Sequence, residues 1–402
     1  MQSWLRVFEF LPVGYGGEGR GMSIKLIKDT ILQNIIFSKF EGLLFSNQLI
    51  NRLHYITQNS MAFRVFPADR TARFIHSTGV MHLASEIFRN GLSNTDHTIL
   101  KKFIEEKRNL IKAIVDENID KLPDFGPDKI REETRAHSCT ALRLLGDKLN
   151  DILGESFVNH SVFYNDVFCI KENYATYLIL LTSLRAMGLL HDIGHLPFSH
   201  LAEFALEDVL FDLETKKDRG IELNQKENEI ALLIKSFTSV HGEKIHETVA
   251  IKLIELFFVD IEEQIKQNSV SDDKIFTLLF VKVIKSLILE IKKGKDGSLF
   301  SLYSIVASDF DADRLDFVMR DGLASGLIDK TGDVDRIIKM YCLCENPKAN
   351  DLKDKFIFLP SVQCLNDVQQ VLLDRYRIYK FLINHHKVKK MDYILQKAMT
   401  LL

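Results

Sequence analysis

The stretch LLHDIGHLPFSH, residues 189–200, is the segment of the chain richest in side chains that bind metals or transfer protons. His191 and Asp192 follow an apolar run, His195 lies one helical turn after His191, and His200 follows a proline turn. A neutral imidazole and a carboxylate both bind borderline divalent metals, so this stretch predicts a metal site. Burying so many polar groups without a shared partner costs several kcal/mol, which favours a metal or an anion.

The residues before this stretch predict the helix that carries it. Four side chains recur at helical spacing on one face: Leu180, Leu184, Met187 and His191. We expect a helix over 174–195, ended by Pro197, because proline removes an N–H donor and restricts the residue before it.

A second helix is predicted from Arg73 onward, with an inward stripe of His76, Val80, Leu83 and Ile87. Further helices are expected over 246–259, 274–293 and 301–320. The pattern of residues 23–58 is mixed and allows a short strand or hairpin. Residues 335–402 are interpreted as helices, with one candidate strand at 356–359. The predicted fold class is all-α with a minor β element.

The composition narrows the class of protein. The chain has 402 residues, of which 46% are hydrophobic and 27% charged, so a large core is expected and overall disorder is not. Only 7 Pro and 20 Gly argue against a turn-rich β-sandwich or barrel. A net charge of −3 provides no global basic field for nucleic acid. Five scattered cysteines predict reduced thiols, and without a signal-peptide pattern or membrane span we expect a cytoplasmic protein.

The domain organisation is predicted as one core with appendages. Residues 1–22 contain clustered glycines and are predicted to be a flexible leader. Residues 23–340 form the core, interrupted by excursions over 100–135 and 208–243 that are interpreted as solvated helix and loop. Residues 341–402 form a C-terminal helical region that stops inside an apolar pattern, as a truncated or unusually short end would.

Two more ligand candidates lie far from residues 189–200. His76 is on the inward stripe of its helix, and Asp313 lies in SDFDADRLDFVMRD, residues 308–321. A helix start tolerates negative charge, so capping explains Asp309 or Asp311 well. It explains the later acidic residues less well, because the apolar residues interleaved with them imply burial of Asp313, Asp316 and Asp321.

The order of these motifs resembles the HD-domain superfamily, and within it the deoxynucleoside triphosphate (dNTP) triphosphohydrolases. These include the bacterial dGTPases and the mammalian enzyme bearing a SAM domain. The motifs are RF-x-HS-x-GV, LLHD-IGH-x-PFSH, a later HE and D-x-DR-x-DF-x-x-RD, over roughly residues 25–345 and more weakly 365–395. The resemblance implies an HD-domain helical fold and metal-polarised attack on the α-phosphate, which releases deoxynucleoside and inorganic triphosphate.

The resemblance also implies roles for single residues. The metal ligands would be His76, His191, Asp192 and Asp313. The active-site histidines and their acidic partners would be His195, His246, Glu247 and Glu203, with His200 near the leaving oxygen. The phosphate contacts would be Arg73, Arg314 and Arg375. Gln58 and Asp321 would contact the sugar 3′-hydroxyl, with Phe317 under the sugar.

Two imidazoles and two carboxylates give Mn, Fe, Zn or Ni a nearly neutral shell, and Mg would accompany the triphosphate. The sequence also departs from the family pattern. Phe317 and Ile383 stand where tyrosines are expected, which leaves selection against ribose open. Ser46, Asn51 and His54 replace guanine-binding residues of the nucleotide-activated enzyme, so GTP activation does not carry over, although another nucleotide activator remains open.

Other functions and partners remain open on the sequence. Another HD-type nucleotide phosphodiesterase or a nuclease would use the same metal ligands. A small basic cluster of Lys387, Lys389 and Lys390 is compatible with this, although a solvated helix face is the commoner reason for such a cluster. A regulatory module that only binds nucleotide would not need the catalytic set. The family implies a homo-oligomer (dimer, tetramer or hexamer) and a role in trimming dNTP pools, including antiviral defence against phage.

Overall fold

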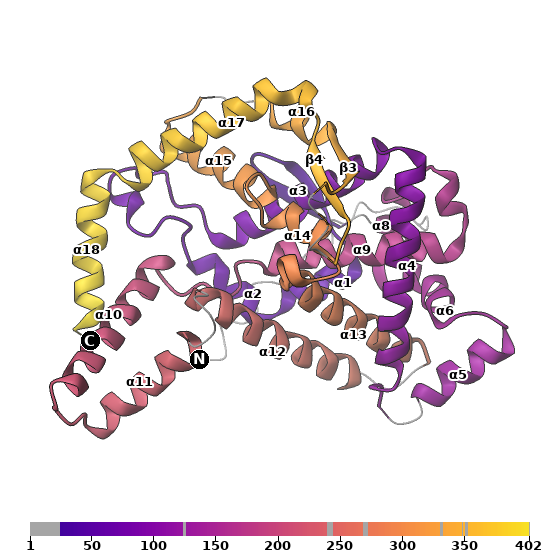
Figure 1. Ribbon diagram of the computed structural model, residues 1–402, viewed down its shortest axis with the longest axis horizontal. Coiled ribbons are helices and arrows are strands. Elements are labelled where there is room, and N and C mark those ends of the chain that lie inside the picture. Colours follow the sequence, from indigo (N-terminus) through magenta and orange to yellow (C-terminus); the bar gives the residue numbers. More distant parts are fainter. Residues whose placement is uncertain are drawn as a thin grey trace, which may run out of the picture.

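The structure is a computed structural model built from helices packed around one core, with two small antiparallel sheets of two strands each (Figure 1). This confirms the predicted all-α class with a minor β element. No described helix has an apolar run long enough to cross a membrane. The predicted leader lies outside the described residues, which are 25–401 apart from 124–125, 239–243, 268–271, 330–332, 348 and 350–352.

The elements follow in chain order. The first half contains β1 (Leu26–Asp29), β2 (Gln33–Ile36), α1 (Lys39–Ser46), α2 (Gln48–Asn51), η1 (Arg52–Tyr55), η2 (Ala62–Arg64), α3 (Arg73–Ser93), α4 (His97–Ile119), α5 (Gly126–Ala136), α6 (Ala141–Asp147), α7 (Leu149–Leu153), α8 (Glu155–His160), η3 (Asp166–Cys169) and α9 (Lys171–Leu190). The second half contains α10 (His200–Asp218), α11 (Gln225–Thr238), α12 (Ile245–Gln267), α13 (Asp272–Lys292), η4 (Gly294–Asp296), α14 (Phe300–Val306), α15 (Ala312–Ser325), α16 (Val334–Lys339), β3 (Tyr341–Glu345), β4 (Phe356–Pro360), η6 (Val362–Cys364), α17 (Leu365–Arg377), the π-helical η7 (Ile378–Ile383) and α18 (His386–Thr400).

Helices α3 and α9 pack against each other at the centre of the fold. The predicted stripe of α3 is at most 2% exposed. Every residue of α9 from Ala175 to Leu190 is buried, because α3, α4, α6 and α13 surround it. The predicted end of this helix is wrong: α9 stops at Leu190, and His191 is its C-cap. The chain turns here, before Pro197, because Gly194 must lie directly against the backbone of α12.

The helix predicted over 301–320 is in fact two helices, α14 and α15. The backbone of Asp311 is extended, and its carboxylate accepts the N–H of Arg314, which starts α15. The capping interpretation of Asp311 is therefore confirmed, and the cap starts α15 as a helix separate from α14, which ends at Val306. Helix α15 then packs against α3, so its acidic first turn faces the centre of the fold.

Both predicted excursions contain more helix than expected. Within 100–135, α4 packs against α9 and α13 and buries Phe103, Ile104, Ile111 and Val115, so the solvated interpretation is wrong. Even Lys107 is buried and is paired with Asp354 at 2.8 Å. Charged residues on the outer face of α4 obscured its apolar stripe. Residues 208–243 contain the rest of α10 and all of α11, which project at the lower left of Figure 1.

The two sheets lie at opposite ends of the sequence. Residue Leu26 of β1 pairs with Ile36 of β2, and this hairpin falls in the region where one was allowed. Strand β4 covers the candidate strand at 356–359, but its partner β3 was expected to be helical. Strand β3 has only five residues and packs against α3, so β4 and α3 stabilise a segment whose own pattern is too short to predict.

Candidate metal centre and active site

Four side chains from three segments converge beside the ends of α3, α9 and α15. Those from His191 and Asp192 follow α9, whereas His76 and Asp313 lie in the first turns of α3 and α15. His76 Nε2 lies 3.0 Å from Asp313 Oδ1 and 3.8 Å from Asp192 Oδ2. His191 Nε2 lies 3.4 Å from Asp192 Oδ1 and 3.9 Å from Asp313 Oδ1. The structure thus brings together all four residues predicted as metal ligands.

The geometry of this centre fits a divalent metal. Two atoms that bind one ion at about 2.1 Å lie about 3.0–3.5 Å apart. His191 Nε2 is buried without a hydrogen-bond partner, which is costly unless another group binds its lone pair, and His76 Nε2 faces the carboxylates of Asp192 and Asp313. Two nitrogen and two oxygen donors suit Mn, Fe, Zn or Ni.

The outer ring nitrogens of both histidines are fixed by acceptors. His76 Nδ1–H donates to Asp316 Oδ2 at 2.8 Å, and His191 Nδ1–H donates to the Gly188 carbonyl at 2.7 Å. Each bond leaves Nε2 to face the metal position. Asp316 also accepts from Arg320 Nε at 2.7 Å. Asp316 stood out in the sequence only as a carboxylate that capping explained poorly.

Charges at the centre are strongly coupled. Burial alone would lower the pKa of His76, but Asp313 and Asp316 outweigh it and raise the pKa to about 10. A metal that binds here must therefore displace a proton from His76. Burial also opposes ionisation of Asp192, yet the guanidinium of Arg73, in direct contact, holds its pKa well below the ordinary value.

A strained turn after Pro197 positions Arg73. Phe198 and Ser199 have φ angles of 66° and 53°, in the left-handed region that residues other than glycine rarely adopt. In this conformation the Ser199 hydroxyl accepts from Arg73 Nε at 3.0 Å and donates to the Thr57 carbonyl at 2.9 Å. The predicted phosphate-binding Arg73 thus lies at the metal centre, 3% exposed.

Arg52 and Gly194 fix the backbone of the turn that follows His191 and Asp192. The Arg52 guanidinium donates to the carbonyls of Ile193 and His195, the latter at 2.8 Å. A Cβ on Gly194 would lie 1.9 Å from the His246 carbonyl oxygen, so only glycine lets the turn approach α12 this closely. Sequence reasoning missed Arg52, because more than 140 residues separate it from the carbonyls that it binds.

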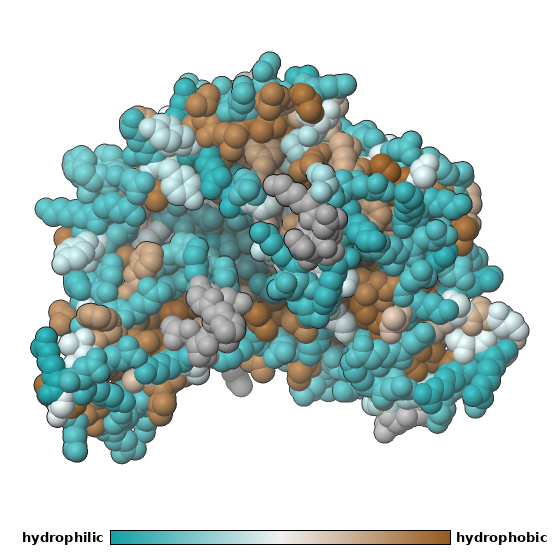
Figure 2. Space-filling model, in the orientation of Figure 1, coloured by the Kyte–Doolittle hydropathy of each residue, from teal (hydrophilic) through white to brown (hydrophobic). Residues whose placement is uncertain are grey.

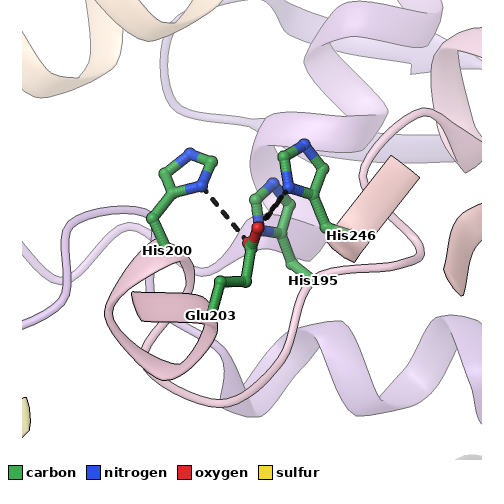
Figure 3. Close-up of side chains that lie close together, drawn as sticks. All are labelled: His195, His200, Glu203 and His246. Atoms are coloured by element: carbon green, nitrogen blue, oxygen red, sulfur yellow. Dashed lines mark hydrogen bonds and ion pairs between the residues drawn. The ribbon is translucent and has the colours of Figure 1, made fainter. Parts of the chain in front are cut away.

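A second cluster lies beside the metal centre and consists of His195, His200, Glu203 and His246 (Figure 3). His246 Nδ1–H donates to Glu203 Oε2 at 2.9 Å, and His200 Nδ1 lies 3.3 Å from Glu203 Oε1. The rings of His195 and His246 stack with centroids 4.2 Å apart. Four ligand atoms of the cluster lie within 4.8 Å of one another, so a cation fits here as well.

His195 connects the two clusters. Its Nε2 is 3.2 Å from Asp192 Oδ1, and its Nδ1 is 3.6 Å from Glu203 Oε1. Burial lowers the pKa of His195 to about 3 although Asp192 opposes the shift, so the ring is neutral at pH 7. Because ionised Asp192 only accepts, we assign the proton to Nε2, which leaves a lone pair on the buried, unpartnered Nδ1.

Glu203 remains ionised among these three histidines. Burial would raise its pKa, but hydrogen bonds from His200 and His246 hold the pKa well below its ordinary value. Glu247, predicted to share this orienting role, is exposed on α12. In the described part of the chain, Glu203 is the glutamate that contacts His195, His200 and His246.

The predicted phosphate contacts differ in their placement. Arg314 is adjacent to a metal ligand and is paired with Asp311 at 2.5 Å, with its side chain 30% exposed. Arg375 lies farther along the chain on α17, with its guanidinium 5.6 Å from the centroid of Tyr379. Tyr379 in turn meets Phe317 edge-on at 6.3 Å. The structure therefore links Arg375 to the predicted sugar platform through one aromatic ring.

The predicted sugar-reading pair is buried and incompletely bonded. Asp321 is 1% exposed, and both Asp321 Oδ1 and Gln58 Oε1 are buried without a partner. Asn59 Nδ2 donates to Asp321 Oδ2 at 2.9 Å and lies 3.1 Å from Asp69 Oδ2. Burial raises the pKa of Asp321 to about 7 and that of Asp69 to about 6. Sequence reasoning missed Asn59 and Asp69, for which no motif gave a signal.

Comparisons with known proteins show which fold this chain shares. No protein-family model matches the chain. An HD domain-containing protein of Acanthamoeba polyphaga mimivirus is 24% identical over 224 residues, which is 56% of this chain and 38% of that protein. A solved phosphohydrolase of Bacteroides thetaiotaomicron matches with a TM-score of 0.52 and 18% identity, over 94% of this chain and 59% of the other. The chain thus has the helical fold of a phosphohydrolase and spans less than two thirds of either relative.

Proposed function

We propose that this chain, which shares its fold with a helical phosphohydrolase, hydrolyses dNTPs to deoxynucleoside and inorganic triphosphate. One observation carries the proposal: ligand atoms from three separate segments converge at 3.0–3.9 Å from one another beside an ionised Glu203. The motif resemblance, together with the buried Asp321, supports a deoxynucleotide as the substrate.

The residues of both clusters fit this reaction. A bound divalent ion would polarise the α-phosphate and lower the pKa of the attacking water. The residues that would hold it are His76, His191, Asp192 and Asp313. Water oxygen adds to the α-phosphorus, the bond to the 5′-oxygen breaks, and a proton passes to that oxygen. The ionised Glu203, hydrogen-bonded to His246, would take up the proton of water through that ring, and the half-exposed His200 can protonate the leaving oxygen.

Substrate selection would depend on buried polar atoms that have no hydrogen-bond partner in the structure. Gln58 Oε1 and Asp321 Oδ1 lack partners, and a 3′-hydroxyl can donate to either. An analogue without this hydroxyl would leave them unpaired, which disfavours its binding. Arg73 and Arg314 are engaged by carboxylates and would exchange these for triphosphate oxygens.

Product analysis tests the reaction directly. The chain is loaded with Mn²⁺ and incubated in H₂¹⁸O with four dNTPs and four NTPs, each with and without a second nucleotide. The expected product is inorganic triphosphate that carries the label, and His191→Ala should yield none. Pyrophosphate with a nucleoside monophosphate would refute the proposed bond choice.

The same preparation tests the alternative nuclease activity. Lys387, Lys389 and Lys390 are exposed on α18 and are compatible with contact to a phosphate backbone. A labelled single strand is therefore incubated with the wild-type chain and with His191→Ala. Degradation by the wild-type chain alone, without triphosphate release from dNTPs, would favour a nuclease over the proposed triphosphohydrolase.

We also propose that the chain assembles with copies of itself. Large apolar side chains are exposed on α17 and η7, and they are Leu365, Leu372, Leu373, Tyr376, Tyr379 and Phe381. Figure 2 shows hydrophobic residues gathered at the top of the molecule, where Figure 1 places α16 and α17. A contiguous apolar patch of this kind is typical of an interface. A concentration-dependent mass in analytical ultracentrifugation would support the assembly, and a monomer at every concentration would refute it.

A further inference from the structure

One cavity in the described part of the chain is lined by none of the proposed metal ligands. Its volume is about 580 Å³, within the range of small-molecule sites. We call it the distal cavity. Its apolar wall includes Phe157, Leu181, Met319 and Ile338. Its polar wall includes Asn34, His82, Glu86, Arg89 and His160. A second hollow of about 310 Å³ shares Glu86, Arg89 and Asn90 with it, so these residues border both.

The cations of this wall are held by weak contacts. Arg89 contacts Glu86 at 3.2 Å and the His160 carbonyl at 3.4 Å, and its side chain is 27% exposed. Lys339 pairs with Asp335 on an exposed helix face. Such pairs contribute only about 0–1 kcal/mol, so an incoming anion can replace the carboxylates. Arg185 is different, because both oxygens of buried Glu41 hold it.

Two histidines complete the polar wall. Burial lowers the pKa of both His82 and His160, so both rings are neutral at pH 7. A neutral imidazole can donate to an anionic oxygen, and it gains a proton readily once that anion is bound. Arg89 and these rings give the lining of the cavity three hydrogen-bond donors for an anionic oxygen, and Phe157, Leu181, Met319 and Ile338 give it apolar surface.

The distal cavity and the metal centre are built on the same three helical segments. His82 follows His76 by six residues on α3, and Met319 follows Asp313 by six residues on α15. Leu181, likewise a wall residue, lies on α9, which ends just before His191. Six residues of helix rise about 9 Å, so a ligand in the cavity touches each segment close to its metal ligand.

A continuous chain of hydrogen bonds and ion pairs also connects the distal cavity to the metal centre. The β1–β2 turn forms part of the cavity wall, and its Ile31 and Leu32 N–H groups both donate to Asp29 Oδ1 at 2.8 Å. Asp29 Oδ2 pairs with Arg320 Nη1 at 2.9 Å. Arg320 Nε donates to Asp316 at 2.7 Å, and Asp316 accepts from His76 at 2.8 Å. These contacts join the turn in the cavity wall to His76, one of the proposed metal ligands.

We propose that the distal cavity binds a small organic phosphate with an apolar ring, and that Asp29 couples its occupancy to the metal centre. The coupling rests on the proposed metal site, whereas the binding does not. Because coupling is reciprocal, bound phosphate should change metal affinity by the same factor as metal changes phosphate affinity.

Binding is measured by calorimetry on the metal-free full chain, with AMP, GMP, CMP, UMP, adenosine and inorganic phosphate as probes. At least one monophosphate should bind, and Arg89→Ala should weaken it about tenfold by removing a charge-assisted hydrogen bond. Arg314→Ala is the matched control, since this arginine is similarly exposed but lies at the metal centre. The site would be overturned if adenosine bound as tightly as AMP, or if no monophosphate bound with a dissociation constant below about 1 mM. It would also be overturned if only Arg314→Ala lost monophosphate binding.

Coupling is measured as the Mn²⁺ dissociation constant, from the spin-resonance signal of free Mn²⁺, with and without saturating probe. A shift of about fivefold or more is expected. Asp29→Asn should still bind the probe, which also reports that it is folded, but should lose most of the shift. An identical Mn²⁺ constant with and without probe would overturn the coupling. Neither measurement depends on hydrolysis, so a failure of the proposed reaction remains distinguishable.

Discussion

His76 donates its Nδ1–H to Asp316 at 2.8 Å, although the two residues are 240 positions apart in the sequence. This bond fixes the ring so that Nε2 faces Asp192 and Asp313. Asp316→Asn should weaken metal binding about 10–100-fold, because the amide cannot accept as strongly and the ligand becomes less basic. Metal titration measures this, and exposed Asp309→Asn is the control. Equal affinity in both variants would contradict the orienting role.

The two histidines and two aspartates should bind the metal as a unit. His191→Ala or Asp313→Ala should each abolish retention of metal through dialysis and reduce hydrolysis to background, because three ligands no longer hold the ion tightly. Elemental analysis of the purified chain measures the metal. The exposed His137→Ala should retain wild-type metal content. Full metal retention in Asp313→Ala would contradict the proposed ligand set.

Glu203 should act in proton transfer and not in metal binding. Glu203→Gln keeps the shape but weakens the hydrogen bonds to His200 and His246, so kcat should fall about 10²–10⁴-fold with metal content unchanged. Glu207→Gln, on the exposed face of α10 one turn later, should have no effect. Loss of metal together with activity would indicate that the second cluster holds a required cation.

The buried pair of Asp69 and Asp321 predicts a pH-dependent stability. Burial raises their pKa values to about 6 and 7, while both titrate near 4 when the chain unfolds. Between about pH 4 and 7 the native state therefore binds more protons, and the free energy of unfolding falls as the pH rises. Asp321→Asn should reduce this slope and stabilise the chain at pH 8 by on the order of 2 kcal/mol.

Thermal unfolding from pH 5 to 8 measures this difference against the wild-type chain. The two curves should converge at low pH, where Asp321 is protonated in the native state. The exposed Asp309→Asn should follow the wild-type curve throughout. Parallel curves for Asp321→Asn and wild type would contradict the raised pKa.

Phe317 and Tyr379 should together influence sugar selection. Their rings meet edge-on at 6.3 Å, so Tyr379 packs against the ring on which the resemblance places the sugar. Phe317→Tyr should increase the ratio of kcat/KM for dNTP over NTP about tenfold through one additional hydrogen bond. Tyr379→Phe should change the ratio in the opposite direction. An unchanged ratio in Phe317→Tyr would show that this ring serves only packing.

Much of the fold was predictable where the pattern is local. The stripes of α3 and α9 follow from apolar residues spaced within a few turns, and the Asp311 cap follows from the preference of helix starts for acidic side chains. Prediction failed where contacts between residues far apart in the sequence determine the local structure. Charged residues on α4 concealed a buried face, and the short strand β3 depends on β4 and α3. The end of α9 is set by the close approach of Gly194 to α12.

The sequence alone determined which residue types were available for a metal: two histidines and two aspartates, on helical faces that local spacing makes apolar. Only the tertiary structure decided that His76 and Asp313 meet the turn at His191, that Asp316 orients His76, and that Glu203, not Glu247, contacts the histidines. The physical reason is that periodicity is set by neighbours within a turn or two. The convergence of side chains depends on how whole helices pack, and local sequence spacing does not encode that packing.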